Sequence, residues 1–163
     1  MSLSDQQEIN LMDHSGDGDG NFIQYLTFMM ANEEYGIEIL SVQEIRGWEP
    51  MTAIPNSPAY VTGVINLRGT VVPVIDLRQR FQLPKVDYSD VTVVVIVKVL
   101  IEGHEKIMGI VVDAVSDVYN LDKDAVSQTP AVGEMANKEF IDGLINVGDK
   151  MVVLLDLNKV LDI

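Results

Sequence analysis

The sequence predicts a mostly β protein built from two small five-stranded barrels, with a few short helices. Three observations lead to this fold class. Valine and isoleucine occur in short runs bounded by turn residues, which is typical of strands. Helical periodicity is weak along the chain. An ungapped internal duplication divides the sequence into two similar units, near residues 22–83 and 91–163.

Regular structure is expected to begin at Phe22. Segment 1–21 is rich in Gly and Asp and has no apolar periodicity, so it predicts a disordered acidic tail. Beyond it, two pairs of apolar runs predict β-hairpins that turn at Asn32-Glu33 and at Glu102-Gly103-His104. The expected strands are Gln24–Met30, Tyr35–Ile39, Val71–Leu77, Val91–Leu100, Ile107–Val112 and Met151–Leu157.

Three segments predict short helical turns. They are Leu40–Ile45, Leu77–Phe81 and Asn158–Leu161. Each is too short for the sustained 3.6-residue periodicity of a full helix. The helices are therefore expected to connect strands, not to form a layer of their own.

The internal duplication is the strongest structural signal. Residues 63–77 align without gaps with residues 143–157, and Gly, Ile, Asn, Val, Asp and Leu recur at matching places. Upstream, residues 36–45 align with residues 109–118. A unit of about seventy residues therefore occurs twice.

Each unit holds around five short strands. An open sheet of this size would leave its edges exposed, and closure into a small barrel removes them. One unit alone has too few residues for a stable core, so we expect the two units to pack together with a cleft between them. Whether strands are exchanged between the barrels stays open from the sequence.

Composition narrows the functional classes. The 163 residues carry a net charge of −14, which disfavours binding to nucleic acid or to an anionic membrane because both would repel such a surface. The absence of cysteine excludes a disulfide framework, a thiolate metal site and a thiol nucleophile. The first ten residues lack the features of a secretory signal, and residues 91–101 are too short to span a bilayer. These features predict a cytoplasmic protein.

Candidate catalytic and metal-binding residues are weak. Asp76 and Asp156 occupy matching places in the two units and could form a general acid–base pair of an acidic hydrolase, but their position before Leu at a strand end favours a helix-capping role. Asp17, Asp19 and Asn21 have the spacing of a calcium-binding loop, but its essential Gly and Glu positions are not filled. We therefore predict no catalytic residue, no metal and no cofactor.

Three surface features instead suggest a protein-binding module. Arg68, one of four arginines, lies in a tight turn, where it is either a solvated hairpin residue or an anchor for a partner. Val42 and Ile45 flank Glu44 close to the single Trp, a pattern that also suits core packing. Val115 and Val118 occupy the equivalent places in the second unit. If the pseudo-two-fold holds, these apolar residues converge on the inter-barrel cleft, where a helix could bind.

These residues carry a resemblance to a known family. Segment 34–47 (EYGIEILSVQEIRG), segment 63–69 (GVINLRG), segment 72–78 (VPVIDLR) and segment 109–118 (GIVVDAVSDV) resemble the CheW-like domain family of chemotaxis coupling proteins. The resemblance covers residues 22–163. The family includes the regulatory domain of the histidine kinase CheA and the front half of CheV. The chain as given shows no kinase motif and no receiver domain, which favours a coupling protein over a CheA-type or CheV-type regulatory module.

The resemblance implies two SH3-like five-stranded barrels and a non-catalytic scaffold that couples chemoreceptors to CheA. It implies that the tip of the receptor's helical hairpin lies in the groove between the barrels. By position, the residues implied to bind the receptor are Val42, Glu44, Gly63, Arg68, Gly109, Val115 and Val118. Gly63 is expected to shape the loop beside Arg68.

The resemblance also implies two contacts besides the receptor contact. One barrel docks on the homologous domain of CheA, and the opposite barrel makes a second contact that builds rings in receptor arrays at the inner membrane face. The segment at 127–135 is expected near that second surface, although the sequence assigns no residue to it. The chain is expected to be a monomer or to assemble weakly in such rings.

Overall fold

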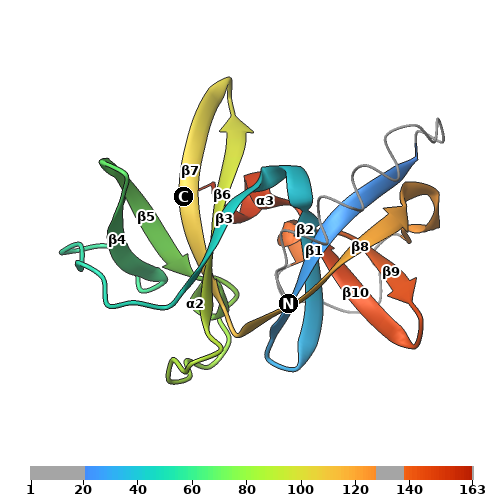
Figure 1. Ribbon diagram of the computed structural model, residues 1–163, viewed down its shortest axis with the longest axis horizontal. Helices are drawn as coiled ribbons and strands as arrows, with labels where there is room; N and C mark the ends of the chain where they lie inside the picture. Colours follow the sequence, from blue (N-terminus) through green and yellow to red (C-terminus); the bar gives the residue numbers. More distant parts are fainter. Residues whose placement is uncertain (1–20, 128–137, 163) are drawn as a thin grey trace.

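The computed structural model describes residues 21–127 and 138–162. The candidate calcium-binding loop, except for Asn21, lies outside the described residues, as does nearly all of the segment expected near the contact that builds rings. The described chain is mostly β and folds into two five-stranded sheets, each curled on itself (Figure 1). The predicted fold class is confirmed.

The first sheet, called barrel A below, has the strand order β8-β1-β2-β10-β9. Its strands are antiparallel except for β2 and β10, which pair in parallel. The bounds of its strands are β1 Phe22–Met30, β2 Glu33–Glu38, β8 Ala114–Asp122, β9 Ile141–Val147 and β10 Lys150–Leu155.

The second sheet, called barrel B, has the order β3-β6-β7-β5-β4, which repeats the same topology. Here β5 and β7 form the parallel pair. The bounds of its strands are β3 Val42–Gly47, β4 Val61–Leu67, β5 Thr70–Asp76, β6 Val93–Ile101 and β7 His104–Val112.

Both barrels draw strands from both halves of the sequence. The chain leaves barrel A after β2, builds all of barrel B, and returns to barrel A at β8. The first crossing runs through the 3-10 turn η1, Ile39–Ser41, and the second through the single residue Asp113. The barrels are therefore intertwined at two crossovers.

An isolated β-bridge closes each barrel. It pairs the segment that follows one edge strand with the strand at the opposite edge of the same sheet. Thr52 pairs with Val64 in barrel B, and Ser127 pairs with Leu144 in barrel A. Val64 and Leu144 occupy matching places in the duplication. The two bridges therefore repeat one structural feature. They pair backbone N–H and C=O groups of an edge strand that another strand could otherwise bind.

The helical elements are short connectors. The helices α2, Leu77–Arg80, and α3, Leu157–Val160, occur close to their predicted places. The turns η2, Lys123–Ala125, and η3, Lys138–Phe140, were not predicted. The predicted helical turn over Leu40–Ile45 is wrong beyond η1, because β-branched Val42 and Ile45 pair with β6 as part of β3.

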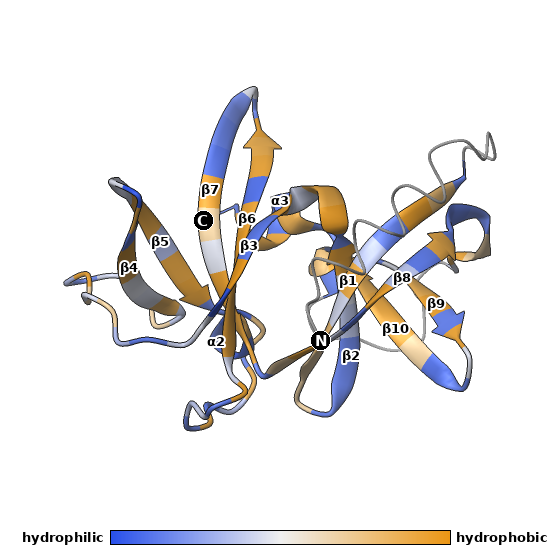
Figure 2. Ribbon diagram, in the orientation of Figure 1, coloured by the Kyte–Doolittle hydropathy of each residue, from blue (hydrophilic) through white to orange (hydrophobic). Residues whose placement is uncertain are grey.

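Among the described residues, three apolar clusters make up the core. One fills barrel A around Tyr25, Ile145 and Leu154, and one fills barrel B around Val74 and Ile96. The third and largest lies between the barrels and takes buried residues from both, among them Leu26, Phe28 and Ile37 of barrel A and Val95, Val97 and Ile110 of barrel B. Strand β6 serves both barrel B and this central core, so it is hydrophobic along most of its length (Figure 2).

Candidate protein-binding surface beside the central core

The apolar residues of the candidate site come from the two edge strands β3 and β8. Val42 and Val115 are half-buried and pack against the central core between the barrels. Val118 is only 8% exposed and belongs to that core. The structure therefore brings the three valines to one core, but it leaves only Val42 and Val115 with appreciable surface for a partner.

The two charged residues of the site pair with each other. Arg68 donates from Nη2 to Oε1 of Glu44 over 2.9 Å, across the gap between the β4–β5 turn and β3. The Arg68 side chain is 76% exposed, whereas that of Glu44 is 28% exposed. An ion pair this open to solvent contributes at most about 1 kcal/mol to folding. Its arginine remains available to a partner.

Local sequence fixes the position of Arg68. Arg68 and Gly69 both have positive φ, +50° and +87°, and join two antiparallel strands through a two-residue turn. Asn66 accepts a hydrogen bond from the Gly69 backbone N–H at 2.8 Å through its side chain. The turn therefore projects the arginine from the end of barrel B.

Arg46 belongs to the same charged cluster, although the sequence reasoning did not include it among the site residues. Its guanidinium lies 3.7 Å from Glu44 and 4.0 Å from Glu49, so Glu44 lies between two arginines. Arg46 also lines a cavity of about 190 Å³ between β3 and β4, with Val94 and Ile65 of the barrel B core among its walls. The alternation Glu44-x-Arg46 on one strand was the available signal, because such residues share a face.

Gly63 is a closure residue of barrel B. It lies inside β4, not in the loop beside Arg68, and its φ is +155°. A Cβ added there would lie 2.5 Å from the carbonyl oxygen of Thr52, the residue whose backbone bridges Val64. Gly63 is thus required by the close approach of two backbones.

Gly109 is likewise interior. It is buried in β7, and a Cβ at this position would lie 2.9 Å from a methyl group of Val94 and 3.0 Å from one of Val74. Both neighbours belong to the barrel B core. The packing of barrel B therefore leaves little room for a side chain at Gly109.

Asp76 and Asp156 cap helices. Asp76 Oδ1 accepts from the backbone N–H groups of Arg78 and Gln79, and Asp156 Oδ1 accepts from that of Asn158. The other carboxylate oxygen of Asp76 accepts from the Tyr88 hydroxyl at 2.7 Å. Burial raises the pKa of Tyr88, and the bond to Asp76 adds to this rise. The structure confirms the helix-capping role that the sequence favoured for Asp76 and Asp156.

Two further properties bear on the class of site. Within residues 21–127 and 138–162, no group of three or more His, Asp or Glu side chains is placed to hold a metal ion. In the same part of the chain, no helix has the length and hydropathy needed to span a bilayer.

The two intertwined barrels, with Arg68 exposed at a turn of barrel B and with Val42 and Val115 half-buried against the central core, define a class of double-barrel β domain. The chain belongs to the CheW-like domain family, whose family model matches residues 24–163. The motifs quoted above lie within this span.

Named relatives agree with this assignment. The chain is 42% identical to the chemotaxis protein CheW of Klebsiella aerogenes over 138 residues, which cover 85% of this chain and 81% of that one. It is 32% identical to the chemotaxis protein CheW of Bacillus subtilis, covering 84% and 85%. Among solved structures, the scaffolding protein TtCheW from Thermoanaerobacter tengcongensis superposes with a TM-score of 0.76 at 33% identity, covering 86% of this chain and 88% of that chain.

Proposed function

We propose that this protein is a non-catalytic scaffold of bacterial chemotaxis that couples chemoreceptors to the histidine kinase CheA. The observation that carries the proposal is the exposed Arg68, paired with Glu44 of the strand that also carries Val42, in a chain of the CheW-like family. The match to the chemotaxis protein CheV3 of Helicobacter pylori reaches 29% identity, whereas matches to CheW proteins reach 42%, which favours the coupling protein over a CheV-type regulatory module.

The proposed receptor-binding residues divide by their exposure. Arg68, Glu44, Val42 and Val115 have surface to offer and are proposed to contact the receptor tip. Val118, Gly63 and Gly109 are buried and are proposed to hold that surface in shape. An amphipathic helix is the partner that suits a half-buried apolar surface with a charged rim.

The proposed mechanism is bivalent tethering. One surface holds the receptor tip and another holds CheA, which brings the kinase to receptor arrays at the inner face of the membrane. A short tether of this kind gives an effective kinase concentration on the order of millimolar. Kinase control then requires a coupling free energy between the two contacts and no chemical step in this protein.

Reconstitution tests the proposal. CheA autophosphorylation is measured with soluble cytoplasmic receptor fragments, with and without this protein. We expect receptor control of the kinase only when the protein is present. Receptor control that is equal without it would contradict the scaffold role.

A further inference from the structure

The two crossovers between the barrels occupy matching places in the duplication. The alignment of Gly36 with Gly109 also aligns Leu40 with Asp113. Leu40 is the middle residue of the first crossover, and Asp113 is the single residue of the second. The two positions have opposite character. Leu40 is 82% exposed, whereas Asp113 is held by contacts from both barrels.

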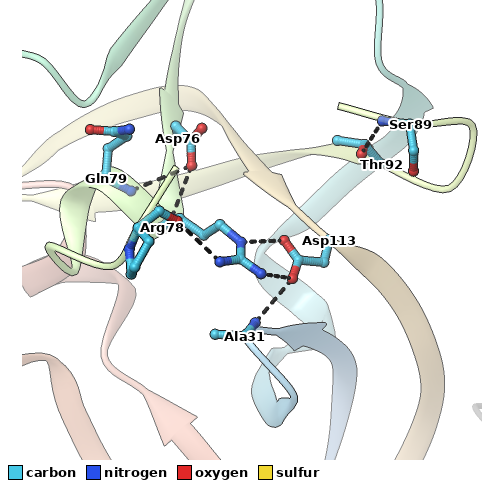
Figure 3. A network of polar contacts seen from close by, with 8 residues as sticks. Ala31, Asp76, Arg78, Gln79, Ser89, Thr92 and Asp113 are labelled. Carbon is cyan, nitrogen blue, oxygen red and sulfur yellow. Dashed lines mark hydrogen bonds and ion pairs between the residues drawn. The ribbon is translucent and has the colours of Figure 1, made fainter. Parts of the chain in front are cut away.

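Asp113 forms a clasp with Arg78 and Ala31. Arg78, in α2 beside barrel B, donates to both carboxylate oxygens, from Nε over 2.8 Å and from Nη2 over 2.7 Å (Figure 3). The backbone N–H of Ala31, in the β1–β2 turn of barrel A, donates to Asp113 Oδ2 over 3.0 Å. One carboxylate therefore ties the second crossover to both barrels.

Further hydrogen bonds hold both Arg78 and Asp113 in place. The backbone N–H of Arg78 is capped by Asp76, and its Nη1 donates to the carbonyl of Pro84. The backbone N–H of Asp113 donates to the carbonyl of Met29 in β1. The Arg78 side chain is 14% exposed, so this charge-assisted, two-point contact is partly shielded from water.

The first crossover lacks this device. The residue that corresponds to Arg78 is Asn158, whose amide donates to the carbonyl of Leu100 at 3.4 Å. Arg80 and Lys106 also join the barrels, but they donate to backbone carbonyls at the end of α3 and not to a crossover. Apolar packing in the central core is non-directional, so it does not by itself fix the orientation of one barrel relative to the other. The directional ion pair is thus confined to one of two equivalent positions.

We propose that Arg78 and Asp113 are positioning residues that lock the angle between the two barrels. Asp113 immediately precedes β8, two residues before Val115, and Arg78 belongs to barrel B, which carries Val42 and Arg68. The lock therefore sets where Val115 lies relative to Val42. This last step rests on the proposed receptor-binding surface.

Paired spin labels test the lock directly. Because the chain has no cysteine, Thr70→Cys and Asp149→Cys place unique labels at the β4–β5 hairpin of barrel B and the β9–β10 hairpin of barrel A. Distances between the labels are measured with the native lock and with Asp113→Asn. Affinity for a soluble receptor fragment is measured in parallel on the unlabelled proteins that keep Thr70 and Asp149. Lys98→Gln is the control, since it breaks the 3.7 Å pair with Glu105 inside one hairpin of barrel B.

We expect Asp113→Asn to broaden or shift the distance distribution and to weaken receptor binding about fivefold or more, the usual range for coupled sites. Lys98→Gln should change neither. An unchanged distribution in Asp113→Asn overturns the lock, whatever happens to binding. A broadened distribution with unchanged affinity keeps the lock and overturns its role in positioning the receptor surface. If Asp113→Asn does not fold, Arg78→Lys, which keeps the charge but loses the two-point contact, takes its place.

Discussion

Arg68 reaches across from the β4–β5 turn to Glu44 of β3, with Nη2 2.9 Å from Oε1. In the unbound protein the two charges therefore satisfy each other instead of facing separate charges on a partner. The arginine remains 76% exposed. A receptor that binds here must either add to this pair or replace it.

The first prediction concerns Arg68→Glu. The change places two carboxylates side by side, but because the pair is exposed the free energy of unfolding should fall by about 1 kcal/mol or less. Affinity for a soluble receptor fragment should fall about tenfold or more, as expected for the loss of an interface anchor. Affinity for CheA should stay unchanged. Equal loss of both affinities in a folded variant would contradict separate binding surfaces.

The second prediction concerns the glycine that closes barrel B. Gly63→Ala should lower the free energy of unfolding by about 1–3 kcal/mol, because the new Cβ meets the Thr52 carbonyl and the backbone is strained at φ +155°. Urea denaturation measures the loss. Gly47→Ala is the matched control: apart from its two chain neighbours, no residue comes within 4 Å of its new Cβ, so its effect should stay within about 0.5 kcal/mol. Equal stability of the two variants would show that the closure tolerates a side chain.

Much of the fold was predictable because its signals are local. Short runs of β-branched residues and the duplication predict two equivalent barrels, and Asp76 and Asp156 at strand ends predict the two helix caps. The error at Leu40–Ile45 arose because pairing with β6 overrides the weak helical preference of six residues.

The candidate site was predictable in part. Arg68 and Glu44 were identified from motifs. Their ion pair was not predicted, because residues 24 positions apart meet only through the curvature of the barrel. Gly63 and Gly109 were expected near the receptor and lie inside barrel B, since no sequence pattern separates a glycine that a partner approaches from one that a strand approaches. The Arg78–Asp113 lock likewise joins distant segments.

The third prediction is a dependence of stability on pH. Burial of Asp113 tends to raise the pKa of its carboxyl group. The hydrogen bonds from Arg78, the backbone hydrogen bond from Ala31 and the charge of Arg78 together outweigh burial and hold the pKa below its ordinary value. A carboxyl group with a lowered pKa in the folded state stabilises the protein above its unfolded pKa, near 3.9. That contribution is lost as the pH falls through the folded pKa. Urea midpoints between pH 7 and about pH 2.5 should therefore fall less steeply for Asp113→Asn than for the native chain. An equal dependence of the urea midpoint on pH in the two proteins would show that protonation of Asp113 is not coupled to unfolding.

The last prediction separates structural carboxylates from catalytic ones. Asp76 is 4% exposed, and its two oxygens bind two backbone N–H groups and the Tyr88 hydroxyl. Asp156 caps α3 in the same way. Because asparagine is also a good N-cap, the double variant Asp76→Asn/Asp156→Asn should remain folded, with a loss of about 1–2 kcal/mol that comes mainly from the buried Asp76 network. Receptor control of CheA autophosphorylation should be retained in the reconstituted system. Asp76→Ala/Asp156→Ala, which removes both caps, should lose more stability than the asparagine variant. A folded asparagine variant that no longer couples receptor to kinase would assign these carboxylates a role beyond capping.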